Sequence, residues 1–501
     1  MMSGSMPRWL RRRIWIGSDL HLISQTFLVI LRIETCGGVS VNLVKGCRMR
    51  EIVFYRELKI LINGVRSYGI QHCCDKNIDN LISDSDKRNN FTIQVHKGFF
   101  LAQKSAIFLL QKIIKEQKRL KADLKQARRD RDKDKVNIIN DLIKEAKYQE
   151  MVVRKSMDAI AWQLFGYDLS VMRRLYYGQE LIDITDSNLD SELCYIDEFV
   201  EENPDGFVLI SDLTSFIQVG DVVTFAPQKG IKIGELKEGK TNLEMFQLID
   251  NAVKANCPRY LKSVLEQMDE KKKEQFHRDI KQIDRNVKTI QTLNEGKGID
   301  LLTGLPVTID KDEIQLSTFE DTVNELLKKC SKKGYAITVI EECLLIGVYE
   351  TDKFPSVAFD AWAKGLGIKM PIIDLRHSMF DPLGYPIFLQ PFKDDHILDI
   401  IKGKKVVKMT IDIETWMKTF ENDGIKWRWL SKKETARINS NLKGKYGIFS
   451  LEGKGIEIEN ENGVVQYIGE GVFSRVFTGL NTLSSIKKLL ITSLEKSESF
   501  M

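Results

Sequence analysis

The sequence lacks the residue groupings that mark several common classes of site. None of its eight cysteines forms a C-x-x-C pair, and its six histidines never approach metal-ligand spacing. Zinc sites need such clusters, so we expect no zinc site and interpret the cysteines as free thiols in a reducing compartment. Walker A and Gly-x-Gly-x-x-Gly signatures are also absent, which argues against ATP-driven translocation by this chain.

Long uninterrupted apolar runs are missing as well. The basic start MPRWLRRR precedes an apolar stretch, but Asp19, His21 and Arg32 interrupt it. A signal peptide or a membrane-spanning helix needs a continuous apolar run. We therefore expect a protein without membrane association and with a cytoplasmic location.

The composition is that of a globular protein of several domains. The chain has 501 residues, 43% hydrophobic content and a net charge of +5, which suits two to four packed domains of α/β type. We expect a mixed N-terminal domain at 1–100, with strands at 53–62 and 90–100, and a charged helical arm at 101–150. A core domain at 151–257 and a heptad helix at 258–296 follow, and 297–501 form a C-terminal α/β domain of unknown role.

Two long charged helices are predicted on either side of the core. Residues 112–131 contain nine cationic and three acidic side chains, so this segment is strongly basic. Residues 259–294 carry an apolar heptad seam, formed by Phe276, Ile280, Ile283, Val287 and Ile290. Each helix fits a solvated arm, a surface that follows phosphates, or a homodimer contact, and the two could also pair with each other.

The core domain has a helix, three strands and a second helix in sequence order. Residues 189–203 form an amphipathic helix that ends at the turn Asn203-Pro204-Asp205-Gly206. Apolar runs at 207–213, 219–226 and 231–237 follow, and a tight turn at 227–230 joins the last two. Residues 241–255 are predicted to be the closing helix.

Charged residues interrupt the second and third strands of this core. Asp221 opens one run, and Glu235 and Lys237 break the next, one residue apart. Because side chains alternate along a strand, Glu235 and Lys237 project from the same face, which Asp221 can reach across the hairpin. Two carboxylates offer the hard oxygen ligands that Mg²⁺ prefers, and a lysine beside them can orient a water molecule.

Residues 150–257 resemble the PD-(D/E)XK nuclease superfamily, the restriction-endonuclease-like fold, whose motif is an Asp on one strand and (Asp/Glu)-x-Lys on the next. Asp221 matches the first acid, Glu235 the second and Lys237 the lysine. The resemblance implies a central α-β-β-β-α core. It also implies that Asp221, Glu235 and the backbone carbonyl of Leu236 bind Mg²⁺ or Mn²⁺, and that Lys237 positions the attacking water.

Two further catalytic positions follow from the same resemblance. Many members carry a glutamate on the preceding helix, and Glu192 is our candidate, with Glu180 and Glu198 as alternatives. A polar residue on the following helix is also common, which points to Gln247. Asp212 is an alternative metal ligand.

The chain departs from the family motif in one respect, because Gly220 rather than proline precedes Asp221.

The function that we expect is metal-dependent hydrolysis of phosphodiester bonds in nucleic acid, with DNA as the expected substrate. Three alternatives stay open: an edge hairpin in which Glu235 and Lys237 form a solvated ion pair, a nuclease-like fold that only binds nucleic acid, and a coiled-coil interaction protein.

The C-terminal half gives weaker signals. Residues 335–350 are predicted to be paired buried strands, and 381–392 an ordered loop. Trp427 and Trp429 stand among cations, as on one face of a strand or in a base-stacking surface. Asp374, Arg376, His377 and Asp381 cluster in a segment that we interpret as a loop satisfied by its own hydrogen bonds.

Overall fold

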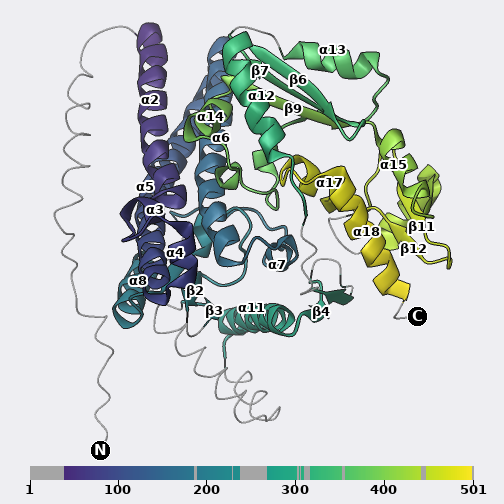
Figure 1. The fold of residues 1–501 in the computed structure, drawn as a ribbon. Coiled ribbons are helices and arrows are strands. Elements are labelled where there is room, and N and C mark those ends of the chain that lie inside the picture. Colours follow the sequence, from purple (N-terminus) through teal and green to yellow (C-terminus); the bar gives the residue numbers. More distant parts are fainter. Residues whose placement is uncertain are drawn as a thin grey trace, which may run out of the picture.

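The computed structural model describes residues 39–498, except 186–188, 228–229, 237–267, 302–303, 305, 310–315, 353–355 and 442–446. This part of the chain is a mixed α/β protein with several small antiparallel sheets. Figure 1 shows long helices on one side and the largest sheet on the other. In the described ranges, no helix combines the length and apolar character needed to cross a membrane.

The N-terminal part consists of helices. They are α2 (Val39–Arg66), α3 (Tyr68–His72), α4 (Ile78–Ser83), α5 (Ser85–Arg129) and α6 (Lys133–Leu164). The strands expected at 53–62 and 90–100 were therefore wrong, since both segments lie inside helices. The buried side chains of α2 explain this, because they recur every three or four residues, the period of a helix: Phe54, Leu58, Leu61, Ile62 and Val65.

The expected charged arm is two helices folded against each other rather than one. Helix α5 ends at Arg129 and α6 begins at Lys133, with Arg131 at a positive φ of 55° between them. Near this turn, Leu120, Ala127 and Ile139 form a small buried cluster of their own. Helix α5 thus pairs with α6, and the pairing considered between the segments 112–131 and 259–294 is wrong.

The three-stranded sheet lies beside the lower end of these helices in Figure 1. Helices α7 (Leu169–Arg174) and α8 (Leu189–Glu202) lead to β1 (Phe207–Ile210), the short 3-10 helix η2 (Ser211–Leu213), β2 (Val222–Ala226) and β3 (Gly230–Gly234). The strands are antiparallel in the order β1-β2-β3. The helix and the three strands predicted from sequence are confirmed, whereas the helix expected at 241–255 lies outside the described residues.

Helix α11 (Glu270–Glu295) follows and leads to the strand pair β4 (Lys297–Ile299) and β5 (Pro306–Thr308). The heptad seam expected on this helix is not its buried face, because Val287 is exposed. The helix buries a more polar face instead, formed by Phe276, Asp279, Asn286, Thr289 and Thr292. The apolar spacing alone could not show this, since two of the buried polar side chains, Asn286 and Thr289, bond to Glu235 and Tyr177 on neighbouring segments.

The largest sheet has the order β6-β7-β9-β8 and is antiparallel throughout. Its elements are α12 (Glu320–Lys333), β6 (Tyr335–Ile340), β7 (Leu344–Glu350), α13 (Val357–Gly365), β8 (Ile373–Asp374), η3 (His377–Phe380), η4 (Ile387–Leu389), α14 (Asp394–Ile401) and β9 (Lys405–Ile411). The pairing predicted for the strands at 335–350 is confirmed by β6 and β7, but their predicted burial holds only for β7, because alternate residues of β6 are exposed. The 3-10 helix η4 lies in the predicted loop at 381–392.

A smaller sheet and two helices complete the chain. The elements are α15 (Ile413–Glu421), β10 (Lys426–Trp429), α16 (Lys432–Asn441), β11 (Ile456–Glu459), β12 (Val465–Tyr467), α17 (Gly471–Phe477) and α18 (Leu483–Glu498). One cluster of buried apolar side chains extends from Phe54 on α2 to Leu494 on α18, so the N-terminal and C-terminal parts share a core.

Candidate functional site

Asp221 and Glu235 lie at the same end of the β2–β3 hairpin. Val222 pairs with Gly234, and Asp221 and Glu235 are the next residues of the two chain segments at this end. The Asp221 N–H donates to the Gly234 carbonyl at 2.9 Å, and the Leu236 N–H donates to Asp221 Oδ2 at 2.6 Å. The hairpin therefore places at one end the two acidic residues that the sequence singled out.

Helix α11 holds the carboxylate of Glu235. Gln282 Nε2 donates to both carboxylate oxygens, at 2.8 and 2.9 Å, and Asn286 Nδ2 donates to Oε1 at 2.7 Å. These two amides were missed by sequence reasoning. Their four-residue spacing places them on one face of α11, and this was the available signal. Figure 1 shows α11 next to the β2–β3 hairpin.

A third carboxylate, that of Asp212, lies on η2. Burial raises the pKa of Asp212, the Arg154 cation acts against this, and the negative charge of Glu235 raises it further. Arg154 also fixes the backbone here, since its guanidinium donates to the Asp212 carbonyl, and at 2.8 Å to the Ile182 carbonyl. Negative charge is thus concentrated where η2 and the hairpin meet.

A buried ion pair on α6 anchors the segment that leads into β2. Lys155 Nζ lies 2.9 Å from Asp158 Oδ2, and the two side chains are 1% and 0% exposed. Asp158 accepts from the Ser215 N–H at 2.7 Å and from the Ser215 hydroxyl at 2.5 Å, and Lys155 donates to the Pro382 carbonyl at 2.9 Å. The pair therefore fastens the helices, the approach to β2 and the C-terminal part together.

The remaining predicted site residues differ in position. Glu192 is 2% exposed on α8, the helix that packs on β1, whereas Glu180 and Glu198 are exposed. Glu192 is therefore the one of the three that lies buried at the sheet. Lys237 and Gln247 lie outside the described residues, so their predicted roles stay predictions.

The donor set at the hairpin suits a hard divalent cation. In the ranges that the structure describes, no three or more His, Cys, Asp or Glu side chains are grouped to hold a metal ion. The set implied by the resemblance is smaller: two carboxylates, Asp221 and Glu235, and the main-chain carbonyl of Leu236. These are the oxygen ligands that Mg²⁺ and Mn²⁺ take. A carboxylate that accepts hydrogen bonds from N–H groups keeps further lone pairs with which it can bind a metal ion.

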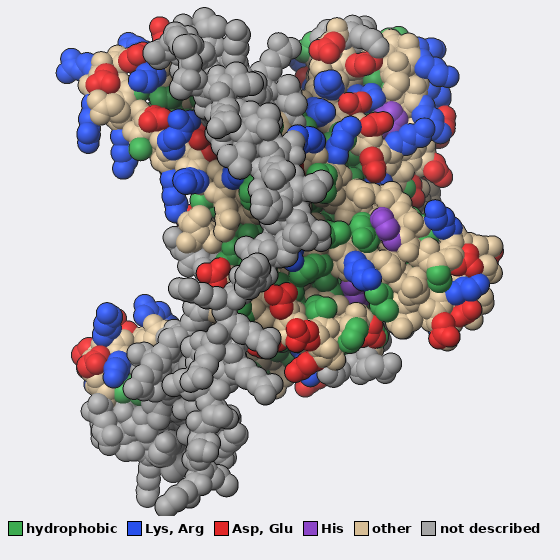
Figure 2. Space-filling view, turned by 90° about the vertical axis from the view of Figure 1, so that its left-hand side faces the viewer, with side chains coloured by type: hydrophobic (Ala, Val, Ile, Leu, Met, Phe, Trp, Pro, Cys, Tyr) green, Lys and Arg blue, Asp and Glu red, His purple; other side chains and the backbone are tan. Residues whose placement is uncertain are grey.

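The basic end of the α5–α6 hairpin is a second feature with functional potential. Lys121, Lys125 and Arg129 on α5 are exposed, as are Arg131 and Lys133 at the turn. Figure 2 shows Lys and Arg side chains gathered at the upper left, where this end projects. Exposed cations on one rigid hairpin are suited to contacts with phosphates.

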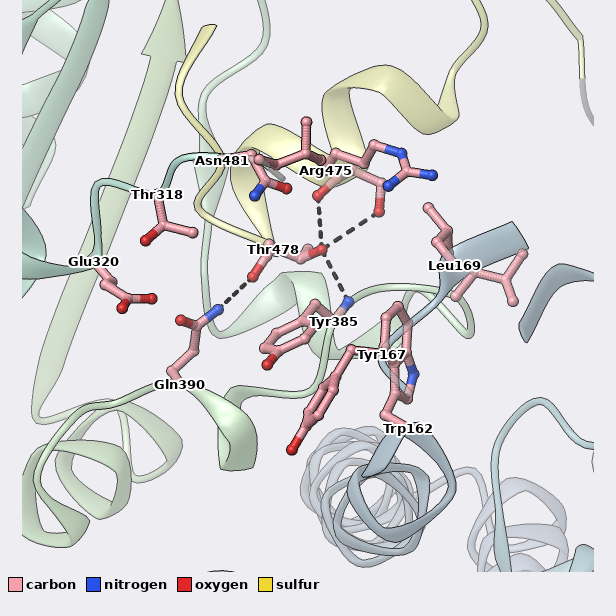
Figure 3. A pocket seen from close by; sticks show the side chains of 14 residues that line it. Trp162, Tyr167, Leu169, Thr318, Glu320, Tyr385, Gln390, Arg475, Thr478 and Asn481 are labelled. Carbon is pink, nitrogen blue, oxygen red and sulfur yellow. Dashed lines mark hydrogen bonds between the residues drawn. The ribbon is translucent and has the colours of Figure 1, made fainter. Parts of the chain in front are cut away.

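A cavity of about 250 Å³ lies between α6, α7 and α17, separate from the carboxylates (Figure 3). Trp162, Tyr167, Tyr385, Gln390 and Arg475 are among the residues that line it. Burial lowers the pKa of Arg475. The Tyr385 N–H and the Gln390 amide bond to neighbouring groups rather than projecting freely into the space.

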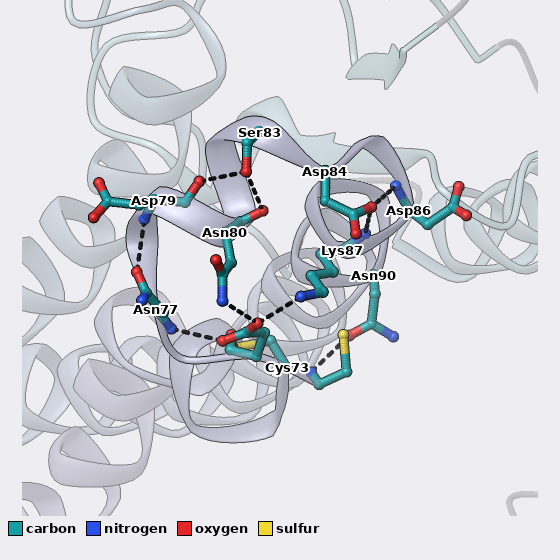
Figure 4. Close-up of polar contacts among 11 residues, drawn as sticks. Cys73, Asn77, Asp79, Asn80, Ser83, Asp84, Asp86, Lys87 and Asn90 are labelled. Atoms are coloured by element: carbon teal, nitrogen blue, oxygen red, sulfur yellow. Dashed lines mark hydrogen bonds and ion pairs between the residues drawn. The ribbon is translucent and has the colours of Figure 1, made fainter.

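Asp75 organises the loop between α3 and α5 in Figure 4. Its carboxylate accepts from Lys87 Nζ at 2.9 Å, from the Asn77 N–H at 2.9 Å and from the Asn80 amide at 2.8 Å. Hydrogen bonds from Lys87, Asn77 and Asn80 lower the pKa of Asp75 to about 2. Each donor belongs to the same loop or to the helix that follows it, so the cluster is structural.

Two C-terminal groups also have structural partners. Asp374 accepts from the Arg376 N–H at 2.8 Å, and Asp381 from the Leu383 N–H at 3.1 Å, so both carboxylates have hydrogen bonds within the segment, as predicted. The segment is not all loop, because Asp374 ends β8 and 377–380 form η3, and Asp381 also accepts from the Ser474 hydroxyl at 3.0 Å. Trp427 and Trp429 lie on β10 with their ring centroids 6.5 Å apart. The alternate spacing therefore places both rings on one face of a strand.

Comparison with known proteins adds no relative: neither a family model, nor a curated protein, nor a solved structure matches this chain.

Proposed function

We propose that this protein is a metal-dependent nuclease that hydrolyses phosphodiester bonds of nucleic acid, with DNA as the expected substrate, and that its active site lies at the open end of the β2–β3 hairpin. The observation that carries the proposal is that Asp221 and Glu235 both lie at this end of the hairpin, with the Leu236 N–H bonded to the Asp221 carboxylate. The order of α8, β1, β2 and β3 agrees with the core that the resemblance implies.

The proposed chemistry assigns a task to each residue. Asp221, Glu235 and the Leu236 carbonyl would hold Mg²⁺ or Mn²⁺, which when bound acidifies a water molecule and neutralises charge on the phosphate. Gln282 and Asn286 hold the Glu235 carboxylate in a fixed orientation. Lys237, just beyond the described end of the hairpin, would orient the attacking water, and Glu192 and Gln247 are the supporting polar groups that the resemblance implies.

Asp212 provides a buried acid beside these groups. Its raised pKa favours the protonated form more than in a free aspartate, because burial and Glu235 disfavour another negative charge. A cation bound at the hairpin would reverse this balance, since positive charge stabilises the Asp212 carboxylate. Metal binding at Asp221 and Glu235 is therefore expected to lower the pKa of Asp212.

The exposed cations of the α5–α6 hairpin would hold the nucleic-acid backbone. Such contacts make binding fall steeply as salt rises, because neutralised phosphates release counterions. The apolar stripe of α5 is covered by α6 of the same chain. This arrangement weakens the alternative of an intermolecular coiled coil through that helix.

The test is a substrate panel. Purified protein is incubated with linear DNA, circular DNA and RNA in Mg²⁺, in Mn²⁺ or in EDTA, and cleavage and retention are followed in parallel. Cleavage that requires the metal supports the proposal, and cleavage of the circle identifies endonuclease action. Cleavage that persists unchanged in EDTA contradicts it.

A second candidate is a nucleic-acid-binding module on the same fold without catalysis. The bonds from Gln282 and Asn286 to Glu235 favour it, since they give this carboxylate a structural role that needs no metal. Salt-sensitive retention of nucleic acid without cleavage in any metal would support this candidate against the first.

A further inference from the structure

The cavity between α6, α7 and α17 lies where the N-terminal helices meet the C-terminal part of the chain (Figure 3). Trp162 lines it from the N-terminal side, and Arg475 lines it from the C-terminal side. Its volume of about 250 Å³ exceeds the ~150 Å³ that is enough to hold benzene in an engineered apolar cavity. Since sites for small molecules often lie at such junctions, this space has the position and size for a ligand with one aromatic ring.

Three aromatic rings form one wall of the cavity. The ring centroids of Trp162 and Tyr385 are 5.2 Å apart with an angle of 75° between the rings, and those of Tyr167 and Tyr385 are 6.4 Å apart. Aromatic rings at such separations favour edge-to-face and offset contacts. A flat ring of a ligand can therefore pack on this wall.

Arg475 supplies a positive charge at one end of the cavity. Its side chain is half-buried and, within the described residues, makes neither an ion pair nor a hydrogen bond. Burial lowers the pKa of Arg475, and the charge of Asp168 opposes this shift. Asp168 lies beyond ion-pair distance, and its carboxylate caps α7 by accepting from the Ser170 N–H at 2.7 Å. Because a desolvated charge is normally paired, this end of the cavity suits an anionic group.

Trp162 adds a hydrogen-bond donor that has no acceptor. The side chain is 3% exposed, and its indole N–H has no partner in the part of the chain that the structure describes. Other polar groups of the cavity are occupied: the Tyr385 N–H donates to the Thr478 hydroxyl at 2.9 Å, and the Gln390 amide donates to the Thr478 carbonyl at 2.6 Å. Since a buried indole N–H usually has an acceptor, a ligand oxygen suits this wall.

A carboxylate lines the opposite end of the cavity. Glu320, in the first turn of α12, is half-buried, and Figure 3 shows it on the far side of Tyr385 from Arg475. Burial raises the pKa of the Tyr385 phenol, and the charges of Tyr167 and Glu320 raise it further, while Arg66 acts against this. The charge of Glu320 therefore acts on the aromatic wall. Because a carboxylate accepts hydrogen bonds and repels anions, this end suits a donor group.

We propose that this cavity binds a small aromatic carboxylic acid that carries a hydrogen-bond donor, such as an amino group, at the opposite end of its ring. The carboxylate of the ligand pairs with Arg475 and accepts from the Trp162 N–H. Its ring packs on Tyr167 and Tyr385, and its donor faces Glu320. The cavity is independent of the proposed nuclease site, because none of the residues that line it lies on the β2–β3 hairpin or on α11.

The test compares three probes on the full-length protein by isothermal titration calorimetry: 4-aminobenzoate, benzoate, which lacks the donor, and aniline, which lacks the carboxylate. We expect 4-aminobenzoate to bind most tightly, because it satisfies both ends. Arg475→Met should weaken its binding about 10–100-fold, the loss typical of a hydrogen bond to a charged group, and should leave aniline binding unchanged. The matched control is Arg437→Met, which replaces an exposed arginine on α16 and should alter neither affinity.

A second variant tests the acidic end of the cavity. Glu320→Gln removes a negative charge that repels anions, so it should strengthen benzoate binding and reduce the preference for 4-aminobenzoate over benzoate. Asp321→Asn is its control, because Asp321 is exposed in the same first turn of α12. Thermal unfolding without ligand identifies variants that have lost their fold.

Two results would overturn the proposal. One is a wild-type protein that does not bind 4-aminobenzoate at millimolar concentration, or that binds aniline equally well, and this comparison needs no variant. The other is equal affinity of the wild type and the folded Arg475→Met variant for 4-aminobenzoate.

Discussion

The buried ion pair of α6 gives the sharpest stability prediction. Replacing Asp158 by asparagine leaves the Lys155 ammonium, 1% exposed, without this counter-charge, while its hydrogen bond to the Pro382 carbonyl stays. Removing one partner of a buried pair typically costs about 3–5 kcal/mol, because the remaining charge stays desolvated. Asparagine is close to aspartate in size, so this loss contains no large cavity contribution.

The same helix provides a matched control. Asp141 and Lys144 have the same three-residue spacing and a 2.9 Å contact, but their side chains are 75% and 77% exposed. An exposed pair is worth about 0–1 kcal/mol, so Asp141→Asn should change the free energy of unfolding by no more than that. Urea denaturation, followed by circular dichroism, measures both variants under identical conditions.

A double variant separates the charge from the hydrogen bonds. Lys155→Met with Asp158→Leu removes both charges and leaves the Ser215 N–H without its acceptor, so about 1–3 kcal/mol should be lost. The double variant is thus expected to be more stable than Asp158→Asn alone. If Asp158→Asn costs no more than Asp141→Asn, the reasoning about the buried charge is refuted.

Three more predictions concern the hairpin carboxylate, the helical core and the cavity. Gln282→Leu with Asn286→Leu removes three hydrogen bonds to the Glu235 carboxylate, and loss of such supporting bonds typically lowers metal affinity about 10–100-fold, which calorimetric Mn²⁺ titration would reveal. Burial lowers the pKa of His96 below 6.5. The neutral imidazole therefore makes its full contribution to the free energy of unfolding above pH 6.5, and this contribution is lost as the pH falls below that value. His96→Gln should weaken this pH dependence in urea denaturation measured on either side of pH 6.5. Thr478→Val removes the acceptor of the Tyr385 N–H at the cavity and should cost about 1–3 kcal/mol in thermal unfolding.

The strands that the sequence predicted correctly have an unambiguous local pattern. Residues 207–210 and 335–350 are rich in β-branched and aromatic side chains, and they form β1 and the pair β6 and β7, whereas 211–213 form the 3-10 helix η2. The segments 53–62 and 90–100 have similar compositions but lie in helices, since their partners are other helices far along the chain. Tertiary packing decided these cases, and propensity alone was not sufficient.

The candidate site was predictable to a similar extent. Asp221 and Glu235 could be found because a turn of known length fixes the hairpin register. Gln282 and Asn286 could not, because nothing in the sequence places α11 against the end of β3. The heptad seam of α11 was misassigned for the same reason: its buried face is set by contacts to Glu235 and Tyr177 rather than by apolar spacing.

The central claim is tested most directly by the rate of Mg²⁺-dependent cleavage of circular DNA by three proteins in parallel: the wild type, Glu235→Gln and Glu274→Gln. Glu274 is exposed on α11, the helix that holds Glu235, so its variant controls for a lost charge in the same region. The account predicts that cleavage is abolished by Glu235→Gln and retained by Glu274→Gln, with folding and DNA binding unchanged in both. Equal cleavage by all three proteins would contradict the assignment of the active site to the β2–β3 hairpin.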